Sequence, residues 1–494
     1  MKLTSTLLQL LTLGAAKAFN DDATTVSYEN CDANALTMEQ LDTISSLGDG
    51  KFYKICPGQY KYSNGTVAPL GQPRCGDGSN YSFYYSSPEE QQSEDKLLIE
   101  LSGGGACWSA ETCQYQQAML KMPPFDFIMG MSCSDLGMIA QSMQGWDVLC
   151  ARTVGSVDFT TYNTVMIPYC TQDVHLGDGE ATYDEVGTIY HSGAHNTFRT
   201  LQWVFENFED PKHIVLTGCS AGGTPLPVVY RLINEYYKTK GVDVKIDVLS
   251  DSPVYLTTNN FLENYFHLWN HQTVMNEIGF DYDSFKNDVQ YPSAVIDYVM
   301  DGSDSNDGFG IVTHDDDPIS IMFYTAMDGN GTLEVEGDME GQATDKLSLG
   351  LNQSEVILKE WWNKMNESFT QATDEHENFD IFIMDGSGHC SSGLYFPMEN
   401  HQPAFEEWVA NMIDDTPILD VNTTSTADIE TSVESAEEPS ESVSDVETAQ
   451  PIDALPSESV NSPYAMSGGT MKLGTKHSLI AAVISFHLLF LLFG

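Results

Sequence analysis

The stretch that says most about chemistry is Gly218-Cys219-Ser220-Ala221-Gly222-Gly223, which directly follows the apolar residues 213–217. A Gly-x-Ser-x-Gly motif at the end of a strand predicts a nucleophile elbow, a strained turn that exposes its central serine above a sheet. Flanking glycines leave room for such a turn. A buried serine in a glycine-rich turn is the alternative. We predict that Ser220 is a nucleophile, that the amide of Ala221 donates to an oxyanion, and that Cys219 is structural.

A second glycine-rich stretch, Ser102-Gly103-Gly104-Gly105-Ala106, follows the strand-like residues 96–101. Loss of one oxyanion donor typically lowers the rate about 100–1000-fold, so a second donor is needed. A glycine loop after an early strand supplies that donor in esterases. We therefore predict that the amides of Gly104 and Gly105 complete the oxyanion hole. A phosphate-binding loop is disfavoured because no Lys-Ser/Thr pair follows.

The general base is predicted to be His389, in the tight glycine-rich segment Gly386-Ser387-Gly388-His389-Cys390. In proteins whose nucleophilic serine lies in such an elbow, the catalytic residues follow one another along the chain in the order serine, acid, histidine. His401 is the competing histidine. The orienting acid must lie between Ser220 and His389. Four aspartates qualify by order, and Asp328 is preferred because it follows residues 319–326, a mostly apolar run interpreted as a strand; the four are Asp251, Asp301, Asp328 and Asp385.

Strands and helices must alternate to position these residues. Strands are predicted over residues 96–101, 164–168, 213–217, 243–249 and 379–384, and helices over 194–208 and 356–369. Such alternation predicts an α/β fold with a mostly parallel central sheet flanked by helices. Chemistry in these sheets lies beyond the carboxyl ends of the strands, where the candidate residues fall. Residues 301–310 are acidic and glycine-rich but do not fit a calcium-binding loop, so a solvated loop is predicted.

Charge and cysteine spacing argue against binding of nucleic acid and of metal ions. The formal net charge is −51, from 72 acidic and 21 basic residues, which disfavours binding to nucleic acid. Ten cysteines in a chain with a leader sequence indicate disulfides, and Cys107 and Cys113 are close enough to close one loop. No CxxC pair occurs and the histidines lack ligand spacing, so no metal or other cofactor is expected.

The two ends of the chain differ in composition from the rest. Residues 1–18 are predicted to be a signal peptide, residues 421–466 a disordered acidic Ser/Thr/Pro-rich stalk, and residues 467–494 a GPI-attachment signal or a C-terminal membrane anchor. Residues 19–420 remain for the catalytic domain. We therefore expect a secreted, cell-surface glycoprotein, with N-glycosylation sequons at Asn64, Asn80, Asn330, Asn352, Asn366 and Asn422.

Four stretches together resemble the pectin acetylesterase/Notum family over roughly residues 45–412: Leu101–Trp108, Pro168–Asp178, Gly218–Gly223 with Leu249–Ser252, and Ile381–Cys390. The resemblance implies an α/β-hydrolase-like fold and metal-free ester hydrolysis. It places the family nucleophile on Ser220 and the histidine on His389, and Ala326-Met327-Asp328 matches the setting of the family acid. The implied activity is removal of acetyl esters from cell-wall or extracellular polysaccharide. A lipid or protein deacylase and a non-catalytic surface binding module are the alternatives.

Overall fold

The computed structural model describes one of two compact units of the chain. The first unit comprises Met1–Val421 with Phe486–Gly494, and it holds all described residues; the second, Asn422–Ser485, lies outside them. The predicted signal peptide, stalk and C-terminal anchor therefore also lie outside the described residues. The described residues are 23–27, 35–37, 50–62, 72–88, 95–123, 125–142, 149–151, 153–154, 157–254, 256–288, 291–329, 354–390 and 402–413.

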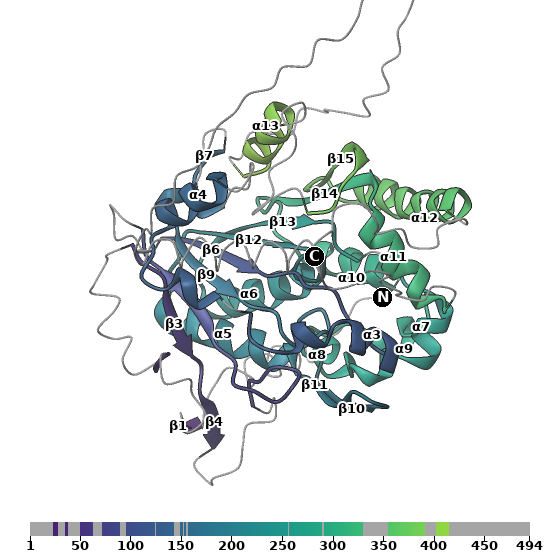
Figure 1. Ribbon diagram of the computed structural model, residues 1–494. Coiled ribbons are helices and arrows are strands. Elements are labelled where there is room, and N and C mark those ends of the chain that lie inside the picture. Colours follow the sequence, from purple (N-terminus) through teal and green to yellow (C-terminus); the bar gives the residue numbers. More distant parts are fainter. Residues whose placement is uncertain are drawn as a thin grey trace, which may run out of the picture. The chain divides into compact units, whose positions relative to one another are not determined.

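A nine-stranded sheet forms the centre of this unit (Figure 1). Six neighbouring strands run parallel to one another, and they are β15, β14, β13, β12, β6 and β9. Strand β5 pairs antiparallel with both of its neighbours, β9 and β3. Across the sheet the order is β15 (Phe379–Ser387), β14 (Phe309–Asp316), β13 (Lys245–Asp251), β12 (His213–Cys219), β6 (Lys96–Leu101), β9 (Asn163–Ile167), β5 (Phe83–Ser86), β3 (Tyr53–Cys56) and β2 (Leu36–Thr37).

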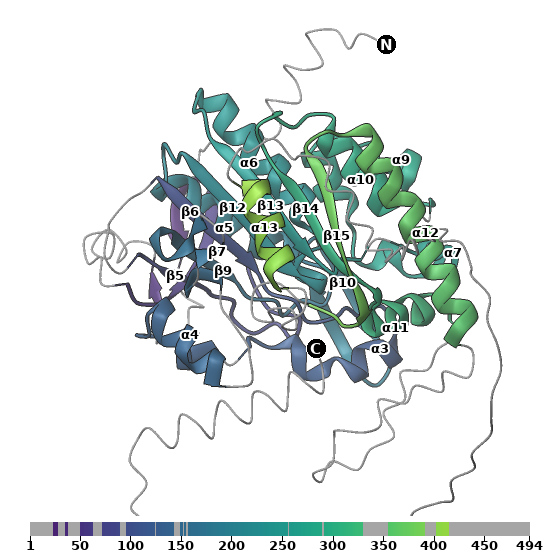
Figure 2. The ribbon, with the colours of Figure 1, turned by 90° about the horizontal axis from the view of Figure 1, so that it is seen from above.

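Both faces of the sheet are covered by helices. Alternate residues of β12 point to opposite faces: Ile214 and Leu216 join the larger buried cluster, and Val215 joins the other. Helices that contribute to the larger cluster include α5, α6, α10 and α12, whereas α4 and α13 contribute to the other cluster (Figures 1 and 2). Their bounds are α4 Cys133–Ser142, α5 Gly193–Asn207, α6 Leu226–Lys240, α10 Tyr291–Met300, α12 Ser354–Glu375 and α13 Gln402–Ile413.

Shorter elements connect this framework. Among the described residues, three two-stranded sheets lie outside the main one, and no helix is both long and apolar enough to cross a membrane. These elements are β1 (Ala23–Ser27) with β4 (Gln59–Tyr62), β7 (Thr153–Val154) with β8 (Val157–Asp158), β10 (Gly179–Tyr183) with β11 (Gly187–His191), and helices α3 (Ala110–Tyr115), α7 (Asn259–Asn264), α8 (Gln272–Glu277), α9 (Tyr282–Phe285) and α11 (Pro318–Met327).

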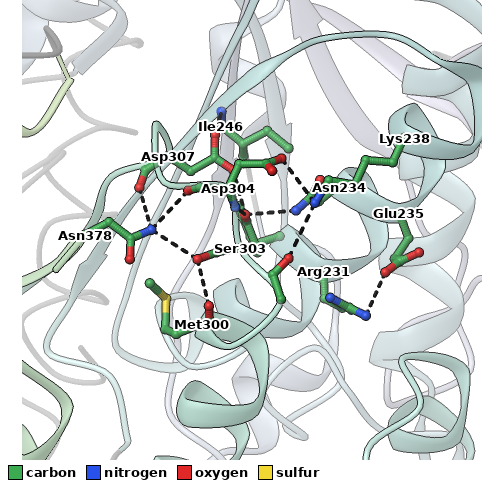
Figure 3. Close-up of polar contacts among 12 residues, drawn as sticks. Arg231, Asn234, Glu235, Lys238, Ile246, Met300, Ser303, Asp304, Asp307 and Asn378 are labelled. Atoms are coloured by element: carbon green, nitrogen blue, oxygen red, sulfur yellow. Dashed lines mark hydrogen bonds and ion pairs between the residues drawn. The ribbon is translucent and has the colours of Figure 1, made fainter. Parts of the chain in front are cut away.

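The acidic segment between α10 and β14 is more than the solvated loop predicted from its composition. Asp301 and Asp304 are exposed, but Asp307 is buried and accepts hydrogen bonds from the amide of Ile246 (2.9 Å) and the hydroxyl of Tyr230 (2.6 Å). The Asn378 side chain donates to the carbonyls of Asp304 and Asp307 on the same loop (Figure 3). This network holds the start of β14, whose other end enters the site described below.

The sheet confirms the predicted α/β-hydrolase-like fold. All five predicted strands and both predicted helices are present, with bounds that differ by a few residues. One interpreted element is wrong: residues 319–326 are not a strand but lie within helix α11. A mostly apolar run fits a buried strand and a buried helix equally well, because neither then shows a clear amphipathic period.

Candidate active site

Ser220 lies at a strained turn directly after the central strand β12. Its φ is +55°, which is uncommon for a residue with a side chain. The turn Ser220–Gly222 leads on to α6. A Cβ atom on Gly218 would lie 2.4 Å from the carbonyl oxygen of Gly222, so only glycine fits there. The structure therefore forms the elbow geometry that the sequence predicts at Ser220.

The predicted oxyanion loop packs against this turn. A Cβ atom on Gly103 would lie 3.3 Å from Cβ of Ser220. Gly104 and Gly105 have φ values of +149° and +72°, which few other residues adopt. Among the described residues, the N–H groups of Gly104 and Gly105 have no hydrogen-bond acceptor. The amide of Ala221 belongs to the first turn of a helix, where N–H groups lack intrahelical acceptors. These amides are available to a ligand.

His389 is bound to a buried carboxylate, and that carboxylate belongs to Asp317. The Nδ1 atom of His389 lies 2.7 Å from Oδ2 of Asp317, whose side chain is fully buried. Asp317 also caps α11: its Oδ1 accepts the amides of Ile319 (3.0 Å) and Ser320 (2.9 Å). The hydroxyl of Ser320 donates to Oδ2 at 2.9 Å. With four donors around it, this carboxylate can fix the orientation of the imidazole.

The carboxylate that contacts His389 is thus that of Asp317, and not that of Asp328, the acid expected from sequence. The two aspartates cap opposite ends of α11, whose ten residues span about 15 Å. Asp328 is exposed, as are Asp301 and Asp385. The preference for Asp328 followed from interpreting residues 319–326 as a strand. A usable sequence signal was present, because Asp317-Pro318 is a typical N-cap followed by proline at the first helical position.

The pKa of His389 is the outcome of opposing effects. Burial lowers the pKa, but the negative charge of Asp317, its hydrogen bond and the charge of Asp251 outweigh burial and raise it above the ordinary value. Asp251 is buried at the end of β13, and Ser252 links it to the histidine segment. The Ser252 hydroxyl donates to Oδ1 of Asp251 (2.9 Å) and accepts the amide of Cys390 (3.2 Å). Asp251 thus acts on His389 from outside the His389–Asp317 pair.

A disulfide brings the histidine segment to the elbow. Cys219 is bonded to Cys390, so the residues before Ser220 and after His389 are covalently joined. A ring nitrogen of His389 and both sulfur atoms lie within 4.8 Å of one another. Since the sulfurs are bonded to each other, they are not thiolate metal ligands. Ser220 and His389 do not hydrogen-bond to each other here, a contact that often tightens only with substrate. His401 lies outside the described residues.

Four disulfides occur in the described part of the chain. The predicted pair Cys107–Cys113 is confirmed, and Cys219 has the structural role that the sequence assigns to it. The remaining two pairs could not be read from sequence, and they are Cys75–Cys170 and Cys133–Cys150.

A mostly apolar cavity of about 50 Å³ opens at Ser220. Burial lowers the pKa of His271 to about 3 and raises the pKa of Tyr291 well above its ordinary value, so both are neutral. His271 Nδ1 and the Tyr291 hydroxyl have no hydrogen-bond partner among the described residues. The cavity is lined by Gly105, Ala106, Val174, Ser220, Ala221, Thr224, Val254, Thr257, Phe261, Phe266, Trp269, His271, Tyr291, Pro292, Phe323 and Met327.

This arrangement has the parts needed for acyl transfer. The predicted nucleophile Ser220 and the predicted donors Gly105 and Ala221 line one cavity, and Gly104 is the next residue in the same loop. His389 and its carboxylate are held beside the elbow. The residue missed from sequence is Asp317.

Comparisons with known proteins find relatives over part of the chain. Residues 68–288 match the family model described as pectinacetylesterase, a range that includes Ser220 but ends before Asp317 and His389. Palmitoleoyl-protein carboxylesterase notum2 of Xenopus laevis is 27% identical over 187 residues, which is 38% of this chain and 35% of that protein. Pectin acetylesterase 4 of Arabidopsis thaliana is 27% identical over 158 residues, which is 30% of this chain and 34% of that protein.

These alignments span about a third of the length of the curated relatives. A solved structure of the Wnt deacylase Notum from Drosophila superposes with a TM-score of 0.46 and 14% identity, covering 69% of this chain and 91% of that one. Both the family model and the curated relatives point to one group of proteins. Over residues 68–288 the chain matches the pectinacetylesterase family, and this is the family that the motifs in its sequence resemble.

Proposed function

We propose that this protein is a serine carboxylester hydrolase that uses Ser220 as nucleophile, His389 as general base and Asp317 as the acid that orients the histidine. The observation that carries the proposal is that Ser220, at a positive φ, shares one cavity with the unsatisfied amide of Gly105 and with Ala221. The match of residues 68–288 to the pectinacetylesterase family supports the same reaction class.

In the proposed mechanism, His389 removes the proton of the Ser220 hydroxyl as Ser220 attacks the ester carbonyl. The amides of Gly105 and Ala221, with Gly104, stabilise the oxyanion. His389 then protonates the departing alcohol, and water hydrolyses the acyl-enzyme through the same steps in reverse. The Asp317 carboxylate keeps the proton on Nδ1, so that Nε2 is the basic atom.

The size of the cavity favours a short acyl group. A buried water needs about 10–15 Å³ on the same measure, so a cavity of about 50 Å³ accommodates a few heavy atoms. An acetyl or similarly short acyl chain fits this space. The cavity therefore favours an acetyl ester, and the family resemblance is the reason for placing that ester on cell-wall or extracellular polysaccharide.

A second candidate activity is removal of longer acyl chains from lipid or protein. A further cavity of about 50 Å³ adjoins the first and shares Thr224, Val254, Tyr291 and Pro292 with it. Displacement of this shared wall would double the apolar space. The name palmitoleoyl-protein carboxylesterase of several relatives is consistent with this alternative.

The test is hydrolysis of p-nitrophenyl esters from acetyl to palmitoyl by the purified protein, with Ser220→Ala in parallel. We expect turnover of acetyl ester by the wild type and none by the variant. Release of acetate from acetylated pectin would then identify the polymer. A folded wild type that is as inert as Ser220→Ala on every ester would reject the hydrolase and favour a binding module.

The proposed location is the cell surface, reached through the secretory pathway. Four disulfides in the described residues are typical of proteins from oxidising compartments. Treatment of cells with a GPI-cleaving phospholipase should release the protein, whereas retention on the cells would favour a peptide anchor.

A further inference from the structure

The segment after β9 holds unusual backbone geometry that the mechanism above does not use. Gln172, Val174 and His175 have φ values of +56°, +51° and +62°, and all three are buried. A residue with a side chain is strained at such a φ and persists there only when its surroundings impose it. Asp173 imposes part of this geometry, because its carboxylate accepts the hydroxyl of Thr171 and the amide of Gly193.

Gln172 forms hydrogen bonds with the oxyanion loop, residues 102–106, and with Cys107, which directly follows that loop. Its side-chain Nε2 donates to the carbonyl oxygen of Gly104 at 2.9 Å, and its own carbonyl oxygen accepts the amide of Cys107 at 3.0 Å. The side chain of Gln172 is fully buried. His175 holds the same loop one step earlier, since its Nε2 lies 2.8 Å from the carbonyl oxygen of Ser102. Burial lowers the pKa of His175 to about 4, so the imidazole is neutral and carries one N–H, which is the donor here.

The contact with Gly104 decides which way the amide of Gly105 points. A trans peptide is planar, so its C=O and N–H lie on opposite sides of the chain. Gln172 holds the Gly104 carbonyl on one side, and the Gly105 N–H therefore points to the other. Gly105 lines the cavity together with Ser220, and its N–H has no acceptor among the described residues.

A peptide between two glycines turns over easily, because no side chain restrains either flanking dihedral angle. Turning it over would place the Gly104 carbonyl where the Gly105 N–H now points. An oxyanion in the cavity would then meet an acceptor in place of a donor. Something must favour the donor orientation, and the side-chain amide of Gln172 makes the contact that does so.

We propose that Gln172 is a positioning residue that latches the Gly104–Gly105 peptide with its N–H facing the oxyanion. The proposal rests on the proposed esterase function. Its effect belongs to the transition state, because a ground-state ester carbonyl carries little of the charge that the amide stabilises.

Gln172→Met tests the latch, because methionine is also unbranched and of similar length but cannot donate a hydrogen bond. We expect kcat on acetyl ester to fall about 10–100-fold, less than complete loss of a donor costs. KM should stay within about twofold, since ground-state binding is not affected. A trifluoromethyl ketone, which forms a tetrahedral adduct with serine, should bind more weakly by the same factor as kcat/KM. The pH midpoint of kcat/KM should not move.

Asn196→Leu is the matched control. Asn196 is buried and also donates its side-chain amide to a backbone carbonyl, that of Arg74, at 3.0 Å, and it accepts the Arg74 amide at 2.9 Å. This variant loses more hydrogen bonds than Gln172→Met but should keep the wild-type kcat. Equal kcat losses in both variants, or a Gln172→Met loss confined to KM or thermal stability, would overturn the proposal.

A measurement on the unmodified protein covers the case in which Gln172→Met does not fold. In a crystal structure of the wild type with the trifluoromethyl ketone, the adduct oxygen should lie within hydrogen-bond distance of the Gly105 nitrogen, with Gln172 still on the Gly104 carbonyl. A reversed Gly104–Gly105 peptide would reject the latch. The esterase proposal fails separately, if the wild type itself turns over no ester.

Discussion

Cys219, the residue before Ser220, is disulfide-bonded to Cys390, the residue after His389. The two cysteines are 171 positions apart in the chain, and their Cα atoms lie 5.5 Å apart. The bond thus joins the end of β12 to the segment after β15, two strands that are not neighbours in the sheet. It ties the proposed nucleophile to the proposed base without using a side chain of either.

Removal of this disulfide should lower both stability and turnover. We expect Cys219→Ala/Cys390→Ala to lower the free energy of unfolding by about 2–5 kcal/mol, as for native disulfides that close long loops. We also expect kcat to fall more than tenfold, because the His389 segment is no longer tied to the elbow. Denaturant unfolding and ester hydrolysis measure the two effects. The control is Cys133→Ala/Cys150→Ala. It removes a disulfide between cysteines 17 positions apart in the chain, outside the candidate site, and should keep the wild-type kcat. Equal kcat losses in the two double variants would contradict the idea that the Cys219–Cys390 bond holds His389 beside Ser220.

Replacement of Asp317 should be far more damaging than replacement of Asp328. Asparagine caps a helix as well as aspartate, so Asp317→Asn should keep α11 intact while removing the charge beside His389. By analogy with serine hydrolases in general, kcat should fall about 10,000-fold because the imidazole adopts the wrong tautomer. Asp328→Asn, at the far end of the same helix, should change kcat less than about twofold. A large loss in Asp328→Asn alone would restore the assignment made from sequence.

The pH profile should show a base with a raised pKa. Ester hydrolysis needs neutral His389, so kcat/KM should decline as the pH falls through a midpoint above about 6.5, the ordinary value for histidine. Asp251→Asn removes one of the charges that raise this pKa, so it should move the midpoint to lower pH. Asp385→Asn, an exposed carboxylate, is the control and should leave it in place. A midpoint that stays fixed in Asp251→Asn would exclude the influence of Asp251.

The same raised pKa affects folding stability with a defined sign. A histidine that binds its proton more tightly when folded stabilises the fold fully below its unfolded pKa, and this contribution is lost as the pH rises through the folded pKa. The pH dependence of unfolding should therefore lose this component in His389→Gln, measured by denaturant titration over the same pH range.

Tyr291 should control acyl-chain length, because it lines both cavities. Tyr291→Ala removes part of the shared wall and should raise the ratio of octanoyl to acetyl ester hydrolysis at least tenfold. Tyr291→Phe is the matched control: it keeps the ring and removes a hydroxyl that has no partner among the described residues. It should leave the ratio unchanged and cost no stability. Unchanged ratios in both variants would show that the acyl chain does not reach the shared wall.

Local pattern in the sequence was enough to predict Ser220 and the glycine loop. A strand that ends in Gly-x-Ser-x-Gly constrains its own backbone, and the strained φ of Ser220 follows from neighbouring residues. The alternation of apolar strands with amphipathic helices was likewise enough to predict the α/β class, because the spacing of apolar residues within each segment indicates its type of secondary structure. The single loop disulfide Cys107–Cys113 belongs with these local features.

The partners of these residues depended on contacts between distant segments. Asp317 lies 72 positions from His389, and an aspartate near a strand end is too common to identify by type. The helix that begins after Asp317 lies in a mostly apolar run that was interpreted as a strand, so the aspartate at the other end of that run was preferred. The contact between Gln172 and Gly104 spans 68 positions and the disulfide Cys219–Cys390 spans 171, and neither has a local pattern. The sequence by itself determined the strained turn of the proposed nucleophile, its glycine loop and the class of fold, because those depend on neighbouring residues. Only the packing of the sheet decided which carboxylate contacts His389, which disulfide joins its segment to the turn, and which side-chain amide contacts the glycine loop.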